Sequence, residues 1–176
     1  MSHLSNFKNA LETAGFDAAI ISNKLNQRYL SGFDFDDGLV LVTKGRSYLL
    51  TDFRYVEAAL AQTTPEMEVL TPEGGKLLCI AGLLGDNGCR KVAIEETVLS
   101  YADFTRYSET LCDYTLEGGA SAMLAELRLY KDELELETIA RAQAITDAAF
   151  AHIVKWIKPE MTEIEVALEL EFFMRK

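Results

Sequence analysis

The chain has 176 residues, of which 49% are hydrophobic and 26% are charged, a composition typical of a globular protein with one good core, or of one domain and part of another. The formal net charge of −11 argues against nucleic acid as a partner, because phosphate binding requires clustered lysine and arginine. The longest apolar run, residues 77–84, is too short to span a bilayer, and no secretory signal opens the chain. We therefore expect a cytoplasmic protein with neither a membrane nor a nucleic-acid partner.

The first part of the chain predicts helices and strands in alternation. Leu4, Phe7 and Leu11 share one helical face, and a short buried strand follows over residues 17–22. Residues 39–43 and 47–51 are dense in apolar and β-branched side chains and flank a turn in which Gly45 is available for a positive φ. This pattern predicts a β-hairpin at the centre of the fold.

The next elements continue the alternation. The sequence predicts a helix over 53–61 with Phe53 and Leu60 on one side, then a strand over 67–70. Thr71 and Pro72 are suited to begin a helix over 76–84. A strand at 92–94, a helix at 100–111 and a strand at 112–116 follow. Alternating strands and helices indicate an α/β fold, and the hairpin requires an antiparallel pair, so we expect a mixed β-sheet flanked by helices.

The character of the sequence changes at residues 117–121, which predicts a domain of residues 1–121 and a helical segment of 122–176. A helix of residues 131–157 begins with Asp132 and Glu135 at capping-box spacing and carries an apolar stripe. A second helix begins at the capping box of Thr162 and Glu165 and is still apolar near residue 176. We interpret this as a chain cut inside a helix.

Several motifs in this order resemble the creatinase/prolidase/aminopeptidase P family. The resemblance is carried first by NQRYLSGF at residues 26–33 and LLTDFRY at 49–55. It continues with VAIEETVLSYADF at residues 92–104 and IKPEMTEIEV at 157–166. The chain departs from the family at Glu160, where a glycine is usual. The resemblance implies a creatinase-type amino-terminal domain, followed by the opening helices of a truncated pita-bread metallopeptidase domain.

The function implied by this resemblance is hydrolysis of the peptide bond before proline. The family holds two divalent metal ions, manganese, cobalt or zinc, with two aspartates, one histidine and two glutamates, none of which can be placed on this sequence. We therefore expect no catalytic residue, no metal ligand and no cofactor in this chain, and no activity from it alone. A metal-free creatinase-type amidinohydrolase and a non-catalytic binding or scaffold module of the same fold remain alternatives.

Motifs for other metal and nucleotide sites are incomplete in this sequence. His152 has no acidic residue three or four positions away on its helix, which argues against a metal site there. The acidic stretch of residues 34–38 lacks the glycine and final glutamate positions of a calcium-binding EF-hand. The Gly74-Gly75-Lys76 stretch lacks the first glycine of a P-loop.

The acidic stretch of residues 34–38 is better interpreted as part of a substrate-binding loop than as a calcium site. In the resembling family, the loop after the YLSGF-like motif can reach across a dimer and close the partner's substrate pocket. By position the substrate-binding residues would be Phe33, Phe35, Asp36 and Asp37. The rings would pack on a substrate side chain without belonging to the core, and a carboxylate would meet a free α-amino group. We further expect a homodimer and a proline-containing peptide as the substrate of the full-length parent. For Arg54 we favour pairing with a nearby acid or with the dimer partner over a substrate-binding role.

Overall fold

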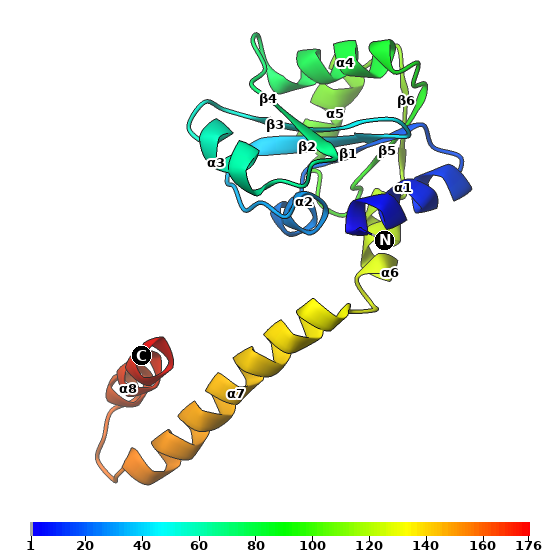
Figure 1. Ribbon diagram of the computed structural model, residues 1–176. Coiled ribbons are helices and arrows are strands. Elements are labelled where there is room, and N and C mark those ends of the chain that lie inside the picture. Colours follow the sequence, from blue (N-terminus) through cyan, green and yellow to red (C-terminus); the bar gives the residue numbers. More distant parts are fainter. Residues whose placement is uncertain (1) are drawn as a thin grey trace. The chain divides into compact units, whose positions relative to one another are not determined.

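The computed structural model describes residues 2–176, which divide along the chain into one unit that ends at Leu129 and another that begins at Tyr130. The first unit contains a β-sheet with helices on both faces (Figure 1). Its strands are β1 (Ala18–Ile21), β2 (Gly38–Thr43), β3 (Ser47–Thr51), β4 (Met67–Leu70), β5 (Lys91–Ile94) and β6 (Thr115–Gly118). Its helices are α1 (His3–Thr13), α2 (Lys24–Ser31), α3 (Val56–Gln62), α4 (Lys76–Asp86), α5 (Tyr101–Thr110) and α6 (Ala120–Leu127).

The six strands lie in the order β4-β3-β2-β1-β5-β6. Only β2 runs antiparallel to its neighbours, β1 and β3, whereas the β3–β4, β1–β5 and β5–β6 pairs are parallel. The predicted mixed sheet and its hairpin are therefore confirmed. The five strands other than β2 therefore end at the same edge of the sheet, the carboxyl edge, and β2 begins there. Ligands of open α/β sheets bind at this edge.

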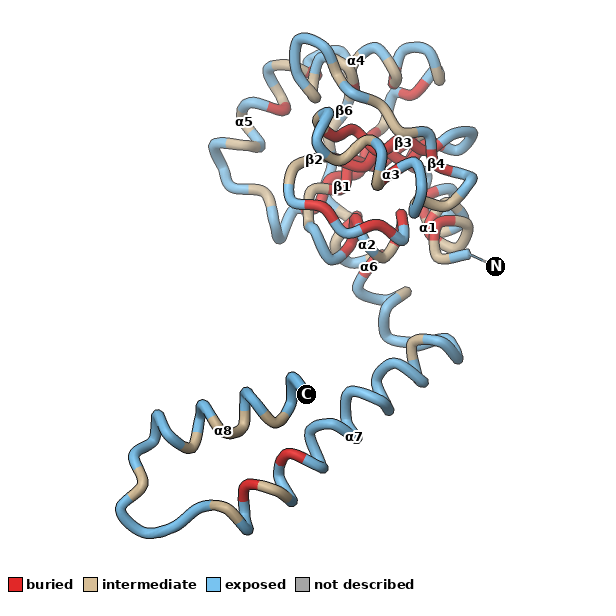
Figure 2. The backbone as a smooth tube through the Cα atoms, turned by 60° about the vertical axis from the view of Figure 1, so that its left-hand side comes forward, coloured by how far each residue is buried: buried red, intermediate tan, exposed pale blue. Residues whose placement is uncertain are grey.

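Alternate side chains of the central strands pack into two separate cores. Ala19 and Ile21 of β1 face a core shared with α1, α2, α3 and α6, whereas Ala18 and Ile20 face one shared with α4 and α5. Figure 2 shows the resulting concentration of buried residues in the strands. The strands need covering on both faces because their side chains are apolar in both directions.

Four local predictions differ from the structure. Helix α3 begins at Val56 and buries Ala59, while Phe53 is 81% exposed. The hairpin turn is closed by the Thr43 hydroxyl, which accepts a hydrogen bond from the Arg46 N–H at 3.1 Å, and Gly45 has no positive φ. Helix α4 has Gly75 as its N-cap, without a side-chain cap. Strand β6 begins at Thr115 because its pairing register with β5 starts there.

Helix α6 belongs to the first unit. The predicted boundary at residue 121 falls inside this helix, and Ala120 and Leu124 lie in the core that α1 and α2 share. The division into units falls after Leu129 for this reason. From α6 onward the described chain forms only helices, as the sequence predicts.

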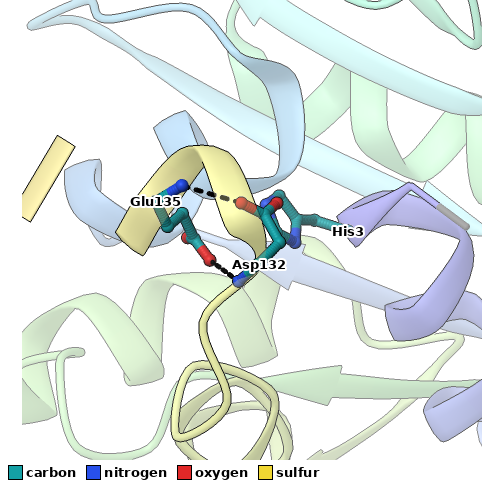
Figure 3. A group of neighbouring side chains, drawn as sticks. All are labelled: His3, Asp132 and Glu135. Carbon is teal, nitrogen blue, oxygen red and sulfur yellow. Dashed lines mark hydrogen bonds between the residues drawn. The ribbon is translucent and has the colours of Figure 1, made fainter. Parts of the chain in front are cut away.

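The second unit is a pair of helices, α7 (Glu133–Trp156) and α8 (Glu163–Arg175). Both predicted capping boxes form, and Figure 3 shows the two reciprocal hydrogen bonds of Asp132 and Glu135. The apolar stripe predicted for α7 includes Ile139, Ile145, Ala149 and Ile153. Ala149 and Ile153 are buried, whereas Ile139 and Ile145 are exposed. Among residues 2–176, every helix is too short or too polar to traverse a lipid bilayer.

Candidate functional site

The predicted substrate loop, residues 33–37, connects α2 to β2. Helix α2 ends at Gly32, whose φ of 74° is left-handed, and the chain then turns toward the carboxyl edge of the sheet. Phe33 and Phe35 are stacked with ring centroids 5.5 Å apart and expose only 3% and 4% of their surface. The expectation that these rings lie outside the core is therefore wrong: both belong to the core shared with α1 and α2.

The position of Phe35 depends on the missing side chain of Gly38. A Cβ atom built on Gly38 would lie 2.2 Å from the Phe35 ring and 2.5 Å from the Leu50 carbonyl oxygen. The ring therefore rests directly on the first residue of β2. This contact fixes the path of the loop between the two phenylalanines and the sheet.

The carboxylates of the loop remain at the surface. The Asp36 side chain is 77% exposed and pairs with Lys24, whose hydrogen bond and charge lower the pKa of Asp36. Asp37 pairs with Lys76 and lies 3.9 Å from the Arg54 guanidinium. A third carboxylate, Asp34, pairs with Arg28, so the loop presents three ion-paired carboxylates beside two buried rings.

Asp52 and Arg54 lie beside the loop, at the end of β3. Arg54 Nε donates to Asp52 Oδ2 at 2.9 Å, and this hydrogen bond lowers the pKa of Asp52. The predicted pairing of Arg54 with a nearby acid is confirmed. Two of the segments that the sequence singled out, residues 33–37 and 51–55, are therefore neighbours at one edge of the sheet.

An open cleft with a volume of about 860 Å³ lies at this edge. Its lining combines the start of β2, the end of β3, the loop before α4 with the start of that helix, and one side of α5. Its polar side chains include Asp37, Asp52, Lys76, Arg106 and Tyr107. Sequence reasoning missed the contribution of Lys76 and Tyr107. The Gly74-Gly75-Lys76 stretch is visible in the sequence, but no local pattern signals that Tyr107 lines the same cleft.

A second polar cluster at the carboxyl edge was also missed. Glu95 is fully buried at the end of β5 and accepts hydrogen bonds from the Asn23 N–H at 2.7 Å and the Asn26 side chain at 2.6 Å. Arg128 donates to the Asn26 side-chain oxygen at 2.9 Å. These contacts hold the start of α2, and with it the helix that leads into the substrate loop.

Neither unit of the described chain brings together by itself the side chains of a two-metal centre. Within the first unit alone, and within the second alone, no three histidine, cysteine, aspartate or glutamate side chains of residues 2–176 converge on one point. His152 is instead held by α8: its Nε2 lies 2.6 Å from Glu169 Oε1, and its ring stacks on Phe173. No reaction step through a metal can be derived from these residues.

Comparison with known proteins shows two matching families, one for each part of the chain. The family model described as Creatinase/Prolidase N-terminal domain matches residues 3–130, and that of Metallopeptidase family M24 matches residues 137–176. A curated relative, the uncharacterized peptidase YqhT of Bacillus subtilis, is 32% identical over 172 residues, which are 98% of this chain and 48% of the relative. The chain spans about half the length of the curated relatives it matches.

Solved structures agree in sequence and in fold. An Xaa-Pro dipeptidase from Bacillus anthracis superposes with a TM-score of 0.91 at 34% identity, over 98% of this chain and 48% of that one. An X-Pro aminopeptidase from Thermotoga maritima gives a TM-score of 0.82 at 30% identity, over 94% and 48%. The chain therefore belongs to the creatinase/prolidase N-terminal domain family and continues into the start of an M24 metallopeptidase domain.

Proposed function

We propose that this chain is the amino-terminal portion of an Xaa-Pro peptidase of the prolidase or aminopeptidase P type. The observation that carries the proposal is the order of the two family matches, an amino-terminal domain over residues 3–130 and the opening of a metallopeptidase domain from residue 137. The Bacillus anthracis dipeptidase supports it, because its likeness extends over both segments. The full-length parent would hydrolyse the bond before proline with two divalent metal ions held by residues that this chain does not contain.

Within the parent, this chain would shape the substrate cleft through the loop of residues 33–37. The carboxylates of Asp36 and Asp37 would meet the free α-amino group of a peptide, since both reach the surface. Phe33 and Phe35, which we expected to touch the substrate, would act through the small part of each ring that stays exposed and would hold the loop in place. We also propose that the parent is a cytoplasmic homodimer.

The test is hydrolysis by the protein that carries this chain. The full-length protein, supplied separately with manganese, cobalt or zinc, should cleave an Xaa-Pro dipeptide or a longer Xaa-Pro peptide with a turnover of about 1–1000 per second. The 176-residue chain assayed with the same metals should show no turnover. Absence of Xaa-Pro hydrolysis by the full-length protein with all three metals would overturn the proposal, as would ordinary turnover by the chain alone.

A further inference from the structure

Glu95 is a buried carboxyl group whose hydrogen bonds within residues 2–176 all come from neutral donors. It directly follows β5 and is fully buried. Its Oε2 atom accepts the Ser22 N–H, the Asn23 N–H at 2.7 Å and the Ser22 hydroxyl at 3.2 Å. Its Oε1 atom accepts the Asn26 side-chain NH2 at 2.6 Å. Removing any of these donors would leave part of a buried carboxylate without compensation, so the group holds its donors firmly.

Asn26 links this carboxylate to an arginine at the end of the first unit. Its side-chain oxygen accepts a hydrogen bond from Arg128 Nη1 at 2.9 Å, while its NH2 group donates to Glu95. The amide of Asn26 is therefore fixed in orientation, since a flipped amide would turn its oxygen toward the carboxylate. Arg128 is the C-cap of α6 and the last residue but one of the first unit. Opposite charges from the end of β5 and the end of α6 thus hold one side chain of α2.

Both ends of the substrate loop, residues 33–37, are attached to the same helix. Gln27, the neighbour of Asn26, donates from its side-chain NH2 group to the Gly38 carbonyl oxygen at 3.0 Å, just beyond the loop. At the other end, the Ser31 hydroxyl accepts the Phe33 N–H at 3.1 Å. The position of α2 therefore determines where the loop starts and where it ends.

Helix α2 is placed largely by hydrogen bonds. Of its four buried residues, Asn26, Gln27 and Ser31 are polar and Leu30 is apolar. Hydrogen bonds are directional, so they specify the rotation of a helix about its axis more strictly than apolar contacts do. A change in the hydrogen bonds of Asn26 should therefore turn α2 and move both attachments of the loop.

We propose that Glu95 and Arg128 are positioning residues of the substrate loop. They act through Asn26, which sets the position of α2, and α2 in turn sets where Asp36 and Asp37 lie at the carboxyl edge of the sheet. The consequence for catalysis rests on the proposed function, in which these carboxylates meet the substrate. By this route the end of the first unit, just before the match to the metallopeptidase family begins, is connected to the loop.

Native-state hydrogen exchange in the 176-residue chain, followed by NMR, tests the connection. The reporters are the Gly32 and Phe33 amides at the start of the loop, and the Leu41 amide in the central strand β2 is the reference. Arg128→Gln changes an exposed side chain and should raise the exchange rates of both reporters about tenfold, with Leu41 unchanged. Arg46→Gln, at an exposed arginine of the hairpin turn, is the matched control and should alter none of these rates. Wild-type exchange in Arg128→Gln would overturn the role of the arginine.

A double variant tests the route through Asn26. If Arg128 acts through Asn26, then Arg128→Gln should raise the exchange rates of the reporters by less than about twofold in a chain that already carries Asn26→Ala. A tenfold further rise in that chain would show that the arginine acts by another path and would refute the link.

Glu95→Gln tests the carboxylate itself. The variant keeps the shape of the side chain but replaces an acceptor by an NH2 group that faces other donors. The Gly32 and Phe33 amides should then exchange faster by a larger factor than the Leu41 amide. An equal rise at Leu41 would make Glu95 a general stabiliser of the first unit and refute its positioning role.

Kinetics of the full-length protein test the consequence for catalysis. Arg128→Gln should raise KM for an Xaa-Pro dipeptide about threefold or more, with kcat nearly unchanged and Arg46→Gln close to wild type. Wild-type kinetics, or a fall in kcat at unchanged KM, would overturn the assignment of Arg128 to the loop. A full-length protein without peptidase activity would refute the proposed function, whereas the exchange experiments would still decide whether these residues position the loop.

Discussion

The contact between Gly38 and Phe35 determines how the substrate loop joins the sheet. A methyl group at residue 38 would overlap the Phe35 ring and the Leu50 carbonyl. We predict that Gly38→Ala lowers the free energy of unfolding by about 1–3 kcal/mol, because either the ring or the strand must move. Urea denaturation followed by circular dichroism measures this change.

Gly82→Ala is the control for that substitution. Gly82 lies inside α4, and a Cβ there would meet no atom within 4 Å. The variant should gain up to about 1 kcal/mol from helix propensity. If Gly38→Ala is as well tolerated as Gly82→Ala, the ring does not rest on the strand as described.

Glu160 occupies a position suited to glycine. Among residues 2–176, Glu160 is the non-glycine residue whose φ is positive, at 74°. It follows Pro159 in a turn in which the Met161 N–H donates to the Lys158 carbonyl oxygen at 3.4 Å. Proline followed by a residue with positive φ is the pattern of a type II turn, which favours glycine at the second place. A glycine at this position would adopt the same φ without steric strain.

We predict that Glu160→Gly stabilises the helix pair of the second unit by about 0.5–1 kcal/mol, because it removes the left-handed strain at a smaller cost in unfolded-chain entropy. Thermal melting followed at the helical band measures the effect. Glu160→Ala removes the same charge but keeps the Cβ. Equal stabilisation by Glu160→Ala would attribute the gain to charge and contradict the role of φ.

At the scale of elements, Asp17 joins three segments of the first unit. Its carboxylate accepts the Arg90 and Lys91 N–H groups at 3.0 Å each and pairs with Lys44 of the hairpin turn at 3.0 Å. The hydrogen bond from the Lys91 backbone, followed by that from the Lys44 ammonium, lowers the pKa of Asp17 to about 2. The folded protein therefore binds a proton at Asp17 less readily than the unfolded chain does.

The sign of the pH dependence follows from this lowered pKa. The contribution of Asp17 is complete above the unfolded pKa of about 4 and is lost as the pH falls toward 2. We predict that Asp17→Asn lowers the free energy of unfolding by about 2 kcal/mol at pH 6 and by much less at pH 2. Urea unfolding of both proteins across this range tests it. A difference that does not shrink on acidification would contradict the assignment.

Local chemistry explains which elements were predictable. The hairpin and both capping boxes were found because turn residues and caps are defined by neighbours in the sequence. Helix α2 was not, since the mainly polar residues 24–31 show no apolar stripe and the start of the helix is held by Glu95, far along the chain. The burial of Phe33 and Phe35 was missed because their acidic neighbours suggest a solvated loop, and only the bare Gly38 makes room for the Phe35 ring. The cleft required tertiary structure, as it joins residues from four segments.

At the scale of the whole molecule, the second unit exposes large apolar side chains on both helices. Ile139, Phe150 and Val154 of α7 and Leu168 and Phe172 of α8 are all exposed within it. Covering each such side chain stabilises a protein by about 1.5–3 kcal/mol, and contiguous apolar patches usually have a partner. We predict that the 176-residue chain associates with a second copy at micromolar concentration.

Sedimentation velocity tests this association. Phe150→Glu should shift the chain toward monomer, whereas Phe53→Glu, a change at an exposed ring of the first unit, should leave the distribution unaltered. A wild-type chain that stays monomeric with its helical content intact would show that these side chains remain exposed to solvent without a partner, and would contradict the predicted association.

The contribution of this chain to an Xaa-Pro peptidase is tested most directly by one kinetic comparison in the full-length protein. Asp36→Ala removes an exposed loop carboxylate, and Asp34→Ala, the control, removes another exposed carboxylate of the same loop. If Asp36 meets the α-amino group of the substrate, its loss should raise KM about tenfold for an Xaa-Pro dipeptide, with kcat nearly unchanged and Asp34→Ala close to wild type. A kcat/KM for Asp36→Ala equal to that of the wild type would contradict the proposed role of this loop in the substrate cleft.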